Sequence, residues 1–276
     1  MNERQSKKLN LGCGFDHKPG YVNVDLQAQH RPDVVANAIE LNAFPSCYYE
    51  EIIAQDVLEH VVRDDVRKAL FEWNRLLAPG GRLFIRTTEI VGLIHLLESP
   101  LNQSMADQER LIQNLFGTQA YTGDFHLTGF TEQTFRFYMW EAGFELETLG
   151  LVHGAFLDSW ARKVRDLSYR HLIDGSIDDA AFVRSAHQEI LGRPPRSEEQ
   201  ARDVGALAAK SKTRLELIRQ MLLSDEHKER NIAAAPAFPR TLHVIASQRP
   251  GLLRRLARKC KRAVKAVLPR GVKQSA

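Results

Sequence analysis

The sequence has few cysteines and no long apolar run. Its 276 residues include three cysteines, Cys13, Cys47 and Cys260, which lie far apart and match neither a metal-ligand spacing nor a disulfide framework. No run of 18 or more apolar residues occurs, so no membrane-spanning helix is expected. The polar N-terminus lacks the apolar core of a secretory signal. We therefore expect no metal site and a protein of the reducing cytoplasm.

Acidic residues are missing from one part of the chain. After Glu229 there is no Asp or Glu, while twelve Lys and Arg remain. Residues 1–229 hold 26 Lys and Arg against 34 Asp and Glu, a net charge of −8. The chain thus combines an acidic body with a basic tail, which the overall charge of +4 conceals.

Residues 8–26 predict a strand, a glycine turn, a short loop and a second strand. The first strand runs into Gly12 and Gly14, and the second ends at Asp25. Glycines at the end of a strand let a ligand approach the backbone, and the carboxylate can accept two hydroxyls of a ribose. Only eleven residues separate Gly14 from Asp25, too few for the helix of a dinucleotide-binding unit. The pattern therefore predicts a nucleoside-containing cofactor other than NAD, with a compact loop over residues 15–20.

A second informative stretch covers residues 51–87. Residues 52–54 predict a short buried strand, followed by Leu58-Glu59-His60. Apolar residues at helical spacing predict a helix over 63–78, which Pro79-Gly80-Gly81 would end. Residues 82–87 then predict another strand.

These motifs resemble class I S-adenosylmethionine-dependent methyltransferases, in particular those of bacterial surface-polysaccharide gene clusters. The resemblance covers residues 8–153 and is carried by LNLGCG with GYVNVDL, by LEH, and by LAPGGRLFI. It implies an α/β fold, a Rossmann-like methyltransferase sheet with flanking helices, and S-adenosyl-L-methionine as the cofactor. It also implies these cofactor-binding residues: Leu11, Gly12, Cys13 and Gly14 at the methionine end, Asp25 and Leu26 at the ribose, Asn37 and Ala38 at the adenine, and Gln55 and Asp56 along the methionine arm.

Two histidines are candidate catalytic residues. His126 lies in a glycine-punctuated loop, residues 117–127, which would cover the acceptor; an imidazole suits removal of a proton from a hydroxyl. His60 could be a base, or with Glu59 a metal ligand. Alternatively, Glu59 and His60 orient loops beneath the site.

The chain beyond residue 160 has a different pattern. Leu191-Gly192-Arg193-Pro194-Pro195, followed some thirty residues later by Leu223-Ser224-Asp225-Glu226, resembles a small helical domain known as domain of unknown function 4214. The resemblance implies a small all-α binding module. We therefore divide the chain into an S-adenosylmethionine-binding methyltransferase domain (1–160), a helical module (161–230), and a linker with a basic amphipathic tail helix (231–276).

The tail sequence suits an anionic surface. Residues 253–267 place Leu, Ala, Val and Cys260 on one helical stripe, with Lys and Arg elsewhere. This pattern predicts peripheral contact of residues 250–268 with the inner face of the cell membrane. An acidic protein surface, including the chain's own acidic body, is the alternative. Nucleic acid is disfavoured because no aromatic residues interleave the charges.

The sequence leaves three functions open. The first is O-methylation of a sugar, glycan or glycolipid precursor, which requires an acceptor oxygen about 3 Å from the methyl carbon and no nucleophilic side chain. The second is methylation of a quinone or other small molecule. The third is a non-catalytic scaffold with a methyltransferase-like fold.

Overall fold

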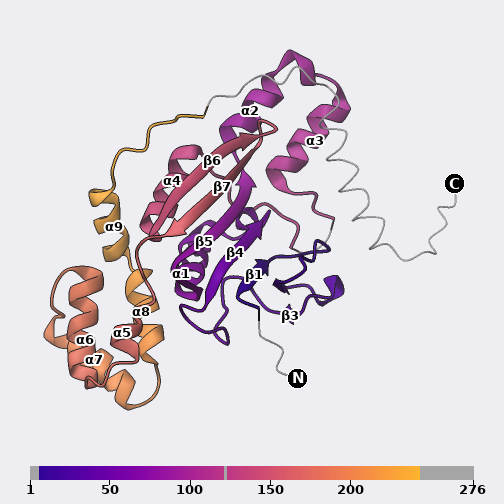
Figure 1. Cartoon of the computed structure of the whole chain (residues 1–276). Helices are drawn as coiled ribbons and strands as arrows, with labels where there is room; N and C mark the ends of the chain where they lie inside the picture. The colour runs from indigo at the N-terminus through magenta and orange to yellow at the C-terminus, as the bar shows by residue number, and fades with distance from the viewer. Residues whose placement is uncertain (1–5, 121–122, 243–276) are drawn as a thin grey trace.

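The protein is built around one seven-stranded sheet (Figure 1). The computed structural model describes residues 6–120 and 123–242. The strand order is β3-β2-β1-β4-β5-β7-β6, parallel except for β7, which runs antiparallel to both neighbours. The strands are β1 Lys8–Leu11, β2 Val22–Asp25, β3 Val34–Val35, β4 Tyr49–Gln55, β5 Leu77–Thr88, β6 Phe144–Val152 and β7 Phe156–Lys163. This sheet with its flanking helices confirms the predicted fold class.

The helices form three groups. Two of them, α1 (Val66–Leu76) and α4 (Glu132–Glu141), contact each other behind the sheet (Figure 1). A hairpin of α2 (Ile90–Glu98) and α3 (Met105–Phe116) follows the end of β5. The C-terminal module contains α5 Arg170–Ile173, α6 Asp179–Ala186, a π-helical turn His187–Leu191, α7 Ser197–Ala208, α8 Arg214–Leu222 and α9 Asp225–Ala234.

The two faces of the sheet differ in burial. Side chains that face α1 and α4, such as Leu11, Ile52 and Ile85, are fully buried. On the opposite face Phe84 and Trp160 stay partly exposed, since the chain from β1 to β3 contains no α-helix that could cover them. The compact loop predicted for residues 15–20 is thereby confirmed. Cross-strand ion pairs, Arg86 with Asp158 and Arg82 with Glu147, adapt this face to water.

Two predicted helices end differently in the structure. The helix expected to reach residue 78 stops at Leu76, because Leu77 already pairs with Tyr49 in the sheet. The charged sequence from 163 to 172 also predicts a connecting helix, but β7 extends to Lys163 and only the short α5 is helical there. The buried Lys163 ammonium donates hydrogen bonds to the carbonyls of Asn74 and Leu77, which holds the segment in an irregular path.

The C-terminal module packs on the same hydrophobic core as the sheet. Phe182 and Leu217 belong to one continuous cluster with Leu11 and Trp73. The predicted boundary at residue 160 falls within β7, and the division into domains stays a prediction.

The two halves of the module's sequence motif meet in space. Arg193, which follows the left-handed Gly192, makes ion pairs with Glu199 in α7 and Glu226 in α9. The motif therefore joins the first turns of α7 and α9, and this structural role explains the spacing of its two halves.

Residues 235–242 form an extended strap that returns from α9 to the base of α2 (Figure 1). Phe238 packs against Phe137 and Trp140 of α4. Arg240 Nη1 lies 2.8 Å from Oε1 of the fully buried Glu89. The Thr241 and Leu242 amides donate to Glu132, which is also fully buried. Two buried carboxylates thus receive part of their hydrogen bonds from the strap; Glu89 also accepts from the Gly92 amide, and Glu132 from Arg136.

In the part of the chain that the structure describes, no helix is long and apolar enough to cross a bilayer. The expectations for residues 250–268 lie outside the described residues.

Removing the strap's cation should destabilise the fold. We expect Arg240→Ala to lower the free energy of unfolding by about 3 kcal/mol, because the fully buried Glu89 carboxylate loses its cationic partner. Urea titration measures this. The control is Arg170→Ala, which breaks an ion pair with Asp174 in which both side chains are more than half exposed. It should lower the free energy of unfolding by less than about 1 kcal/mol. Equal losses in the two variants would contradict the role of the strap.

Candidate functional site

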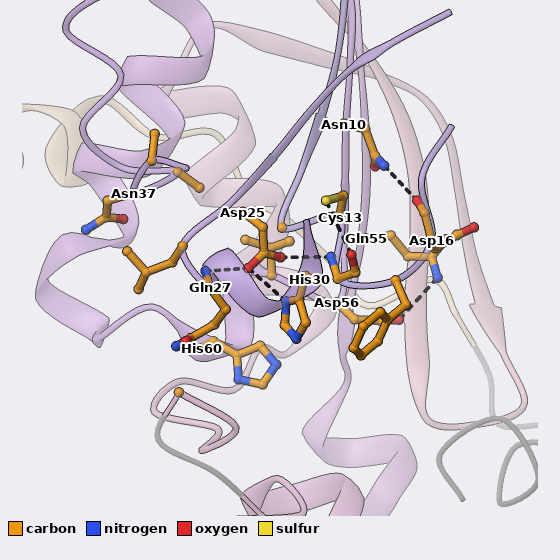
Figure 2. Close-up of a pocket in the computed structure, with 18 of the residues that line it drawn as sticks. Asn10, Cys13, Asp16, Asp25, Gln27, His30, Asn37, Gln55, Asp56 and His60 are labelled. Carbon is orange, nitrogen blue, oxygen red and sulfur yellow. Dashed lines mark hydrogen bonds and ion pairs between the residues drawn. The ribbon is translucent and has the colours of Figure 1, made fainter. Parts of the chain in front are cut away.

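A pocket of about 410 Å³ lies at the carboxyl ends of β1, β2 and β4 (Figure 2). This edge of a parallel sheet is where α/β proteins bind ligands, and the volume falls within the usual range for small-molecule sites.

The glycine turn forms one wall of the pocket. Gly12 and Gly14 have φ values of 58° and 50°, in the left-handed region that favours glycine. A Cβ at Gly12 would also come within 2.5 Å of Val57 Cγ2. The two glycines are therefore required by the path of the turn.

Asp25 joins the turn to the second strand. Its Oδ2 accepts a hydrogen bond from the Gly14 amide at 2.8 Å, and its Oδ1 accepts from the Gln27 amide at 2.8 Å. His30 Nδ1 lies 3.0 Å from Oδ1 (Figure 2). A carboxylate offers about four acceptor positions, so one on Oδ2 is left. Asp25 can thus accept one further hydroxyl, whereas the sequence suggested two.

The loop over residues 15–20 is held by two buried amides. Asn10 Nδ2 donates to the Asp16 carbonyl and to Asn23 Oδ1, each at 2.9 Å. The Lys18 amide donates to the same Asn23 oxygen at 2.8 Å. These hydrogen bonds fix the conformation of the loop, as the packing of a helix would in its place.

Asn37 lies at the far end of the pocket. Its Oδ1 accepts from the Ile39 amide at 3.2 Å, the geometry of a local turn. The side chain is exposed and its amide nitrogen is directed away from that turn bond (Figure 2). Asn37 is therefore a turn residue that is also placed to meet a ligand.

Gln55 and Asp56 close the opposite wall after β4. Asp56 has a φ of 56°, an uncommon value for a residue with a side chain, and Gln55 Nε2 donates to its carboxylate at 3.2 Å. Strained backbone of this kind is often found at functional sites.

Glu59 and His60 hold the loop that carries His126. The Glu59 carbonyl accepts from the Leu127 and Thr128 amides, and His60 Nδ1 lies 3.0 Å from the Phe125 carbonyl oxygen. The Glu59 carboxyl is fully buried against Thr87 Oγ1 at 3.1 Å. Burial, with the nearby Asp56 charge, raises its pKa to about 8. Glu59 and His60 point to different partners and form no metal-ligand pair.

His126 lies behind His60. Their ring centroids are 4.9 Å apart in an edge-to-face arrangement, and His126 Nδ1 lies 3.0 Å from the Asn114 carbonyl oxygen. Burial, and then the neighbouring His60, lowers the pKa of His126 to about 4, so its ring is neutral at pH 7.

The structure brings together most of the predicted site residues. Those lining the pocket are Gly12, Cys13, Gly14, Asp25, Leu26, Asn37, Ala38, Gln55, Asp56 and His60. Leu11 is buried in the core instead, and His126 is not part of the lining.

Sequence reasoning missed several lining residues, chief among them Phe15, Lys18 and His30. His30 is 6% exposed, and its ring stacks edge-on to Phe15 at 4.7 Å. The only local signal was its place five residues after Asp25.

The donor set fits a nucleoside cofactor better than a metal ion. A left-handed glycine turn, a carboxylate with one acceptor position left and an amide side chain suit ribose and adenine groups. Among the described residues, no group of three or more His, Cys, Asp or Glu could hold a metal ion.

A family model matches the part of the chain that forms most of this pocket. Residues 6–85 match the family model described as "Methyltransferase domain". No curated protein matches the chain. A solved S-adenosylmethionine-dependent methyltransferase from Methanosarcina mazei is 18% identical, with 57% of this chain and 92% of that chain covered and a TM-score of 0.43.

A second solved structure is the 1,6-didemethyltoxoflavin-N1-methyltransferase of Burkholderia thailandensis with bound S-adenosylhomocysteine. It is 18% identical, with 57% of this chain and 71% of that chain covered and a TM-score of 0.39. Likeness at this level carries no information on the acceptor. The match over residues 6–85 confirms a methyltransferase domain, and with it the prediction of an S-adenosylmethionine-dependent methyltransferase.

The buried Glu59 should make stability depend on pH. Its pKa is higher in the folded than in the unfolded chain, so the folded state binds the proton more tightly, and stability falls as pH rises from about 5 to 8. The free energy of unfolding of Glu59→Gln should therefore rise relative to that of the wild type by roughly 1 kcal/mol for each pH unit across this window. Urea titrations of both proteins at several pH values measure the difference; parallel profiles would refute it.

Proposed function

We propose that this methyltransferase transfers the methyl group to a hydroxyl of a sugar, glycan or glycolipid precursor. The observation that carries the proposal is the placement of His60. A carbonyl oxygen only accepts hydrogen bonds, so the contact with Phe125 fixes the His60 proton on Nδ1. In this tautomer Nε2 is the hydrogen-bond acceptor, and it belongs to a residue that lines the pocket.

Such an acceptor is what a hydroxyl substrate needs. S-adenosylmethionine supplies an electrophilic methyl group, and the protein has to hold the hydroxyl in line and accept its proton. We assign proton removal to His60 Nε2. His126, expected from the sequence to be the base, is reassigned as a positioning residue because it lies behind His60.

The other residues that line the pocket would bind the cofactor. Asp25 has one acceptor position for a ribose hydroxyl, and Asn37 lies where the adenine would end. Gln55 and Asp56 would line the methionine arm between the glycine turn and His60. The cofactor's methyl group would then face the acceptor side of the pocket.

A quinone or another apolar small molecule is the second candidate. The pocket's rim exposes Phe15 and Leu26, with 52% and 59% of their surfaces accessible. These side chains could cover an apolar acceptor as well as the faces of a sugar ring.

Methyl transfer from labelled S-adenosylmethionine distinguishes the candidates. We expect incorporation into hydroxyl groups of a panel of nucleotide-linked and lipid-linked sugars. Incorporation into quinone precursors alone would favour the second candidate, and no transfer to either panel would favour the non-catalytic scaffold.

The two histidines should differ in effect on the accepted substrate. We expect His60→Gln to lower kcat by about 100-fold or more, the usual contribution of general-base catalysis, with unchanged cofactor affinity. His126→Gln should lower kcat less and leave the shape of the pH–rate profile unchanged, because the base remains. A fully active His60→Gln variant would remove His60 from the mechanism.

A further inference from the structure

The hairpin of α2 and α3 exposes an apolar face that the described chain leaves bare. On α3, Met105, Ile112 and Phe116 lie at positions i, i+7 and i+11 of one helix face, with 73%, 47% and 51% of their surfaces accessible. Ile94 of α2 and Leu101 of the connecting turn are also exposed, at 44% and 62%.

The hairpin has little core of its own. Leu93, Leu111 and Ala155 are buried in the cluster that joins it to the sheet, and Leu96, Leu97, Leu115 and Phe156 pack partly buried against them. An exposed apolar face beside so small a cluster marks an interaction surface.

The strap delivers the basic tail to this face. Arg240, Thr241 and Leu242 are fixed to Glu89 and Glu132, and Glu89 caps the N-terminus of α2. The tail therefore starts at the base of the hairpin, where the strap ends in Figure 1. Residues 243–252 could span up to about 33 Å, enough to reach any point of α3.

The tail sequence complements the face in both apolar pattern and charge. The apolar stripe over residues 253–267 would be about 22 Å long as a helix, against about 18 Å for α3. Residues 243–276 hold ten Lys and Arg and no acid. Glu98 and Glu109 are exposed on the hairpin, and among the described residues neither has an ion-pair partner.

We propose that residues 253–267 dock as an amphipathic helix on the exposed face of α2 and α3. The occupant is the chain's own tail rather than a bilayer, because Glu109 lies on the same face as Met105 and Ile112 and would be repelled by anionic lipid. Tethering at Leu242 also gives the tail a local concentration in the millimolar range.

The docked tail would lie beside the acceptor loop. Phe116, at the end of the exposed face, accepts a hydrogen bond on its carbonyl from the His126 amide at 3.1 Å. The tail helix would thus cover one side of the segment that carries His126.

The test uses Cys260, which falls on the tail's apolar stripe, as a probe in the full-length protein. The rate of its modification by a maleimide is followed by peptide mass spectrometry, which separates it from Cys13 and Cys47. A tail docked nine-tenths of the time reacts about tenfold more slowly than a free one. We expect Met105→Asp/Ile112→Asp to restore the fast rate, and the charge reversal Glu109→Lys to accelerate modification as well.

The matched control is Val164→Asp, an equally exposed apolar residue away from the hairpin, which should leave the rate unchanged. Equal rates in the wild type and both hairpin variants overturn the proposal. Protection that appears only with phosphatidylglycerol vesicles, equally in all variants, overturns it in favour of a bilayer. Protection that increases with protein concentration overturns it in favour of a second copy of the chain.

Discussion

The Asp25 carboxylate is the contact on which the cofactor pocket depends. It accepts hydrogen bonds from Gly14 and Gln27 and contacts His30, and so joins the glycine turn to the second strand. In a sheet whose first connection contains a helix, packing of that helix would fix the turn. Here the connection is a loop, and the Asp25 carboxylate holds its ends together with the buried amides of Asn10 and Asn23. The same group has one acceptor position left, so structure and cofactor recognition share a side chain.

The missing helices shape the rest of the molecule. One face of the sheet is hydrated and carries ion pairs such as Arg86 with Asp158, while the main hydrophobic core packs on the other face. The C-terminal module extends that core through Phe182 and Leu217. The strap then returns to β5, where Arg240 neutralises a carboxylate that has no access to solvent. The C-terminal part is therefore integral to the fold.

Local patterns predicted strands β1, β2, β4 and β5, the glycine turn and the loop in place of a helix, because each depends on residues close in sequence. They also predicted ten residues of the pocket lining. They did not predict the strap, since Arg240 and Glu89 are 151 positions apart. His126 was expected to face the acceptor, but hydrogen bonds to the Glu59 carbonyl set the path of its loop. As a result His60 lines the pocket, and the His126 ring packs against His60 instead. The role of His30 depends on the turn that brings it back to Asp25, which its sequence position alone does not reveal.

Calorimetric titration with S-adenosylmethionine tests the central claim most directly. The account predicts one cofactor bound per chain, and affinity about tenfold or more weaker in Asp25→Asn, since the loss of a hydrogen bond to a charged group costs at least that much. Asp16→Asn, which changes a carboxylate on the same pocket but outside this bonding, should bind as the wild type does. Absence of binding by the wild type at millimolar cofactor, or equal affinity in Asp25→Asn, would contradict the account.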